Sequence, residues 1–159
     1  MADRRAPFPN ADERTTLVAF LDYLRDSVVL KAEGVDEETV RRPMVPSGTS
    51  LLGLVKHLTM VEVAWFQCTF AGREVAIPAV ELEDGDTTES VIAGYRAACT
   101  MSNEIVNSCP DLDQRSARAE TAPEPMSMRW LLVHMVEETS RHAGHADILR
   151  EQTDGATGR

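Results

Sequence analysis

Residues 131–149, LLVHMVEETSRHAGHADIL, contain the pattern that decides the fold. Apolar and ligand-type side chains recur here every three or four residues, the period of a helix that packs one face into a bundle core. The members of this stripe are Leu131, Met135, Glu138, His142, His145 and Leu149. A buried carboxylate and two buried imidazoles without partners would be strongly destabilising or would be forced neutral. A divalent metal would satisfy all three groups, so the stripe predicts a metal-binding helix.

The rest of the chain predicts three more long helices, so that four are expected in all. Periodicity and end signals bound helical segments at 10–34, 51–70, 87–110 and 127–151, with a short helical turn at 36–42. The expected inner faces include Leu17, Leu21, Leu24 and Val28 in the first segment, and Val91, Tyr95, Ala98, Ser102 and Ile105 in the third. Long helices without a convincing strand predict an all-α four-helix bundle. The loop at 73–86 is long enough to be a crossover between two helices.

We expect one domain, which spans residues 11–151. A flexible lead-in at 1–10 precedes it, because Pro7 and Pro9 prevent a helix there. A frayed tail at 152–159 follows it, where Gly155 and Gly158 weaken a helix. The chain has 159 residues, of which 43% are hydrophobic and 26% charged, and this composition is typical of a globular domain with a real core.

Charge and cysteine content narrow the classes of function. The formal net charge is -10, which disfavours nucleic acid and anionic membranes because both require positive charge on the protein. No apolar run approaches the roughly 18 residues of a membrane span. Three cysteines without a C-x-x-C pair argue against a disulfide framework. These features predict a cytoplasmic protein that binds neither nucleic acid nor a membrane.

The predicted metal site combines the last helix with His57 on the second. His57 belongs to the inward stripe Ser50, Leu54, His57, Val61, Ala64 and Cys68. Glu138 and His142 are four residues apart, so they lie side by side on one helix face. Three such ligands leave one coordination position open, which is typical of a catalytic metal. His145 competes with Glu138 as the third ligand.

The remaining polar residues near the predicted site have several possible roles. His145 or His134 would move protons or contact substrate, and Asp147 or Glu62 would orient an imidazole. The alternative to a metal site is a hydrogen-bonded core network, because a single histidine on an apolar face is most often of that kind. Trp65, Phe66 and Tyr95 are interpreted as core packing, and none of the three cysteines has the sequence context of a nucleophile.

Two stretches resemble a known family. Residues 54–66, LVKHLTMVEVAWF, and residues 132–151, LVHMVEETSRHAGHADILRE, resemble the DinB-like superfamily, and the likeness extends from about Arg14 to Gly155. The resemblance implies a four-helix bundle with a crossover and a homodimer. It also implies a zinc or nickel ion held at positions that match His57, Glu138 and His142. Many members have histidine in place of Glu138, and glutamine is common in place of His145.

The resemblance also implies the activity. It suggests a metal-dependent S-transferase that joins a small thiol such as mycothiol to electrophilic small molecules. A metal-dependent hydrolase of the same superfamily is the alternative, since both reactions use an open metal position. A non-catalytic metal-binding protein of the stress response is a second alternative.

Overall fold

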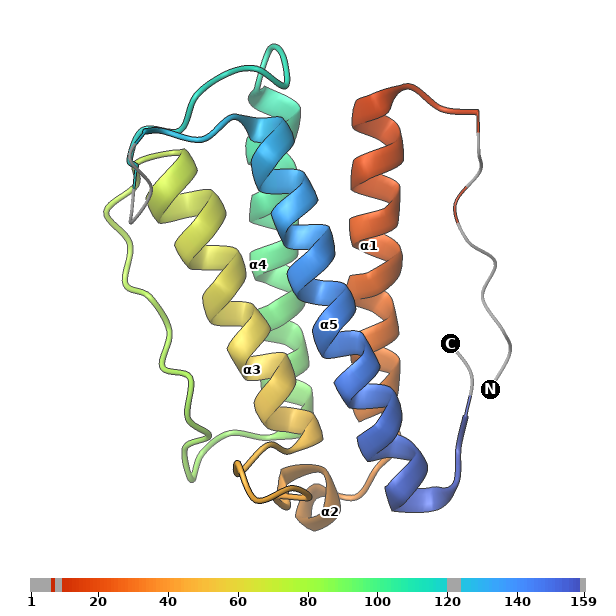
Figure 1. The fold of residues 1–159 in the computed structure, drawn as a ribbon. Coiled ribbons are helices and arrows are strands. Elements are labelled where there is room, and N and C mark those ends of the chain that lie inside the picture. Colours follow the sequence, from red (N-terminus) through yellow and green to blue (C-terminus); the bar gives the residue numbers. More distant parts are fainter. Residues whose placement is uncertain (1–6, 8–9, 120–123, 158–159) are drawn as a thin grey trace.

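The structure is a computed structural model that describes residues 7, 10–119 and 124–157, and these residues form a bundle of four long helices (Figure 1). Its elements are α1 Glu13–Ala32, α2 Glu37–Arg41, α3 Leu51–Glu62, the π-helix η1 Val63–Phe70, α4 Thr88–Ser108 and α5 Met128–Asp154. Within the described residues the only β-type pairing is an isolated bridge between Arg115 and Ser127. The predicted all-α fold class is therefore confirmed.

The connections give the bundle a crossover order. Residues 71–87 leave the end of η1 and run back along α3 to the opposite end of the bundle, where α4 begins (Figure 1). The helices α3 and α4 therefore run parallel, and α1 and α5 form a second parallel pair. The long loop at 73–86 predicts this crossover. Among the described helices, none is both long and apolar enough to cross a membrane.

Local chemistry sets the helix ends, and two predicted ends were wrong. The N-cap of α1 is Asp12, which accepts a hydrogen bond from Thr15 N at 3.0 Å, so the helix begins after the predicted position at Asn10. The helix α5 continues to Asp154, three residues past the predicted end at 151. It ends there because Gly155 adopts a φ of 74°, a left-handed conformation that glycine takes without a steric penalty.

The predicted tail and lead-in are only partly described. Residues 152–154 are helical, and the tail outside α5 is described for 155–157. Most of the lead-in, residues 1–6 and 8–9, lies outside the described part of the chain. So do 158–159 and residues 120–123 of the link before α5.

The predicted second helix is divided into an α-helical and a π-helical part. After Glu62 the backbone widens, and its last turn closes with a bond from Ala71 N to Phe66 O at 3.0 Å. The wider turn rotates the following side chains. Ala64, predicted to face inward, is half-buried, whereas Phe66 is fully buried. Single-turn π segments are often found at functional sites.

The described core contains two large apolar clusters, a third small one and a polar layer. One large cluster includes Val28, Leu58 and Tyr95, and the other includes Leu21, Met135 and Phe66. The polar layer is made by Arg25, Glu62, Ser102 and Thr139, one residue from each long helix, and all four are buried. Glu138 of the candidate site directly precedes Thr139 on α5.

Arg25 and Glu62 form the centre of the polar layer. Arg25 donates to both carboxylate oxygens of Glu62, from Nε at 2.8 Å and from Nη2 at 2.6 Å. Ser102 donates to Oε2 of Glu62 at 2.6 Å, and Asp22 and Asn103 accept from Nη1 of Arg25, each at 2.8 Å. Four hydrogen bonds from its three nitrogen atoms thus join the buried guanidinium to acceptors on α1, α3 and α4. Such pairing is what makes a buried charge tolerable.

Candidate metal centre

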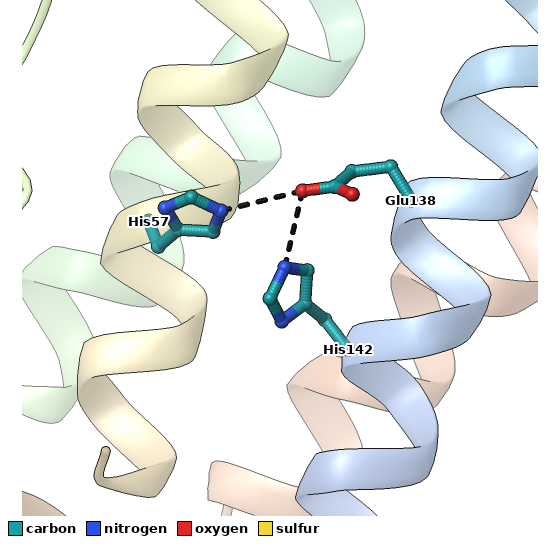
Figure 2. Close-up of side chains that lie close together, drawn as sticks. All are labelled: His57, Glu138 and His142. Atoms are coloured by element: carbon teal, nitrogen blue, oxygen red, sulfur yellow. Dashed lines mark hydrogen bonds and ion pairs between the residues drawn. The ribbon is translucent and has the colours of Figure 1, made fainter. Parts of the chain in front are cut away.

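Three of the predicted ligands come together between α3 and α5 (Figure 2). Oε1 of Glu138 lies 3.4 Å from Nε2 of His57 and 3.1 Å from Nε2 of His142. The two imidazole rings meet edge to face, with centroids 4.8 Å apart. Figure 2 shows all three side chains directed into one gap between the helices. The i, i+4 spacing on α5 and the inward stripe on α3 therefore predict this cluster correctly.

The donor set fits a divalent transition metal. The three ligand atoms all lie within 4.8 Å of one another. Nitrogen and oxygen ligands about 2.0 Å from a tetrahedral zinc ion are about 3.3 Å apart, and the two separations from Oε1 of Glu138, 3.4 Å and 3.1 Å, are close to this value. Two neutral imidazoles and one carboxylate are also a common protein ligand set for catalytic zinc. His57, Glu138 and His142 are thus the residues that would hold the ion.

Arg141 also contributes to the site, and its role was missed in the sequence. Its Nη1 donates to Oε2 of Glu138 at 3.2 Å, so Oε1 is the oxygen that faces the histidines. Burial by itself would raise the pKa of Glu138, but His142, His57 and Arg141 hold this pKa below its usual value. The carboxylate is therefore charged near neutral pH. The i, i+3 spacing of Glu138 and Arg141 is the signal that would have indicated the contact.

His142 is held in a state suited to metal binding. Partial burial lowers its pKa, and the attraction of Glu138 only partly opposes that effect. The imidazole is therefore mainly neutral near pH 7, which is the form that binds metals. Its Nε2 faces Glu138, and its Nδ1 lies 3.4 Å from Nδ1 of His145. His145 is exposed and lies behind His142, in the position of a residue that orients a ligand.

The remaining predicted site residues lie elsewhere. His134 packs between two tryptophans, with ring centroids 4.6 Å from Trp65 and 5.1 Å from Trp130. Its predicted catalytic role gains no support from this aromatic environment. The prediction that Glu62 or Asp147 orients an imidazole was wrong, because Glu62 binds Arg25 and Asp147 pairs with Lys31 at 2.6 Å. Both carboxylates hold basic side chains of α1 against the bundle.

A cavity of about 550 Å³ opens beside the cluster, and His57 and His142 both line it. The turn before α3 forms one wall with Ser47, Thr49 and Ser50, and the crossover forms another with residues 80–82. Arg41 fastens the crossover wall by donating to Glu83 O at 2.9 Å and Asp86 O at 2.6 Å. A cavity of this size holds a drug-sized ligand.

The three cysteines are free, and their thiols are not activated. Cys68 and Cys109 are buried, and burial raises the pKa of Cys109. Burial, reinforced by the nearby Glu62 charge, raises the pKa of Cys99 to about 12. A thiol with such a pKa is a poor nucleophile near neutral pH.

Fold and site together define a class of protein: a four-helix bundle with a crossover that places two histidines and a glutamate between α3 and α5, beside a cavity. A family model described as "MST: Mycothiol-S-transferase" matches residues 16–155. The chain therefore belongs to the mycothiol S-transferase family, which is part of the DinB-like group. No curated protein matches the chain.

Proposed function

We propose that this protein is a metal-dependent S-transferase that joins mycothiol, or a closely similar small thiol, to electrophilic small molecules. The convergence of His57, Glu138 and His142 at the mouth of a cavity is the observation that carries the proposal. The family match supports the thiol as the co-substrate and favours a transferase over the hydrolase alternative.

The protein residues have separate tasks in this proposal. His57, Glu138 and His142 hold a divalent cation, and Arg141 keeps the second oxygen of Glu138 turned away from it. His145 accepts a hydrogen bond at Nδ1 from His142, which fixes the ring so that Nε2 is free for the cation. When bound, the cation would lower the pKa of a coordinating thiol and so present a thiolate at neutral pH.

The large cavity suits a hydrophilic thiol. Its lining includes the polar residues Ser47, Thr49, Arg41 and Glu81 beside the apolar residues Pro43, Leu54, Val80 and Leu82. Hydroxyl and charged groups of this kind are hydrogen-bonding partners for a polar, sugar-like molecule. The reactive thiol comes from this co-substrate, because the chain's own cysteines are buried or have raised pKa values.

The test combines metal analysis with turnover. The purified protein is dialysed, its zinc and nickel contents are measured, and conjugation of mycothiol to 1-chloro-2,4-dinitrobenzene is followed. We expect about one metal per chain and a rate above the uncatalysed reaction that disappears in His142→Ala. Metal binding without turnover toward a panel of electrophiles would support the non-catalytic alternative. A folded, metal-free parent would refute the metal centre.

The assembly of the protein requires a separate measurement. We also propose a homodimer, which sedimentation of the metal-loaded protein would detect. A monomer at all concentrations would refute it without affecting the metal centre, because all three ligands come from one chain.

A further inference from the structure

A second cavity lies beside the candidate metal centre and differs from the first in its chemistry. It has a volume of about 350 Å³ and is lined by Val45, Ser47, Thr49, His145, Ile148 and Leu149. No acidic residue, lysine or arginine is among these described lining residues. Charged residues make up 26% of the chain, yet none of them lines this cavity.

The two cavities are adjacent. Ser47 and Thr49 line both of them, so the two spaces adjoin at one turn of the chain. This turn is closed by hydrogen bonds from Met44 N to Thr49 O and from Gly48 N to Val45 O, both at 3.0 Å. Gly48 has a φ of 86°, which glycine adopts without strain. The turn shared by the two cavities is therefore held in place by its own backbone hydrogen bonds.

His145 connects the second cavity to the metal centre. Its ring lines this cavity, and its Nδ1 is 3.4 Å from Nδ1 of the ligand His142. The cavity also exposes an apolar side chain, since Ile148 is 57% exposed although Leu149 beside it is buried. An exposed isoleucine costs free energy in water, and an apolar ligand that covered it would recover that cost.

We propose that this second cavity binds the apolar, uncharged body of the electrophilic substrate. The inference rests on the proposed transferase, which requires two substrates of different polarity next to each other. The cavity at His57, which alone of the two includes the charged residues Arg41 and Glu81, takes the hydrophilic thiol, and the uncharged cavity at His145 takes the electrophile. The selectivity that follows is for neutral, apolar electrophiles over anionic ones of the same size.

The test uses an uncharged fluorescent probe, N-phenyl-1-naphthylamine, with the metal-loaded protein and no thiol. The variant Ile148→Asp places a short charged side chain in the cavity. Val133→Asp is its matched control, because Val133 is also a β-branched residue of α5 and is 53% exposed, but does not line this cavity. We expect Ile148→Asp to weaken probe binding by about tenfold or more, because a carboxylate opposes an apolar ligand. Val133→Asp should stay within about twofold.

Each other outcome has a defined meaning. Equal loss of binding in both variants, or no loss in Ile148→Asp, would overturn the inference. Dissociation of a dimer by Ile148→Asp would also overturn it, because the exposed isoleucine would then be a subunit contact. Probe binding needs neither thiol nor turnover, so it can fail while the transferase succeeds. If transfer to 1-chloro-2,4-dinitrobenzene is detected, Ile148→Asp should raise the KM for this electrophile and leave the metal content unchanged.

Discussion

Nη1 of Arg141 lies 3.2 Å from Oε2 of Glu138, the carboxylate oxygen opposite the one that meets His57 and His142. One turn of α5 thus carries a candidate ligand, the guanidinium that contacts it and a second candidate ligand at Glu138, Arg141 and His142. Because Arg141 occupies Oε2, Glu138 is set to bind a metal through a single oxygen.

Replacing Arg141 should weaken metal binding without removing the site. Loss of a residue that orients a ligand commonly reduces metal affinity about 10- to 100-fold, and we expect Arg141→Met to fall near the lower end because Arg141 is 55% exposed. Competition with a zinc chelator measures the change. Arg96→Met is the control, since Arg96 is 61% exposed and pairs with Glu33 away from the site. Equal affinities in the two variants would exclude the orienting role.

The third ligand can be identified by a pair of variants. Glu138→Ala should lose bound metal after dialysis, as should His57→Ala and His142→Ala, because three ligands hold an ion far better than two. His145→Ala should keep a full equivalent with reduced affinity, since His145 contacts His142 and not the ligand gap. Elemental analysis of the four proteins decides the question. Metal retained by Glu138→Ala and lost by His145→Ala would reverse the assignment.

The sequence predicts that three candidate ligands lie close together because helical geometry links spacing to position. Glu138 and His142 are four apart on an apolar stripe, and His57 lies on the inward stripe of another helix. In a bundle these features bring the three side chains to the same gap. Residues that act through local i, i+3 contacts, such as Arg141, give a weaker signal because the same spacing is common on any solvated helix.

Other features depend on contacts between helices and were not predictable from periodicity. The buried pair of Arg25 and Glu62 involves residues 37 positions apart, and each one alone resembles an ordinary surface charge. The π-helix after Glu62 shifts the inward stripe away from Ala64, and an α-helical period does not foresee that change. His134 has helical spacing from Glu138, yet the neighbouring tryptophans determine where its ring packs.

The metal-free protein should lose stability as the pH falls below about 6.5. The folded-state pKa of His142 is lowered by burial, so the unfolded chain binds more protons in this range and acid favours unfolding. Glu138, whose pKa is also lowered, acts in the same direction below the ordinary glutamate pKa of 4.5. Melting temperatures between pH 7.5 and 5.5 with a chelator present measure the effect. His142→Gln should flatten the pH dependence, and an unchanged slope would contradict the prediction.

Removing all three cysteines should leave transfer largely intact. The triple variant of Cys68, Cys99 and Cys109 to alanine keeps every group that the proposed reaction uses, because the reactive thiol comes from the co-substrate. Some stability will be lost where buried sulfur is replaced by a smaller side chain. Rates are therefore compared well below the melting temperature of the variant. A folded triple variant with full metal content and no turnover would point to an internal nucleophile.

Breaking the buried ion pair should destabilise the bundle far more than changing its exposed partner. Arg25→Met or Glu62→Met leaves a charge buried opposite an apolar side chain, which typically costs about 3–5 kcal/mol. Asp22→Asn removes a partner whose side chain is 45% exposed and should cost less than about 1 kcal/mol. The double variant with methionine at both positions should recover part of the loss, because no unpaired charge remains. Urea unfolding of the four variants measures these losses in the free energy of unfolding. If Arg25→Met and Glu62→Met lose no more stability than Asp22→Asn, Arg25 and Glu62 are not a structural pair.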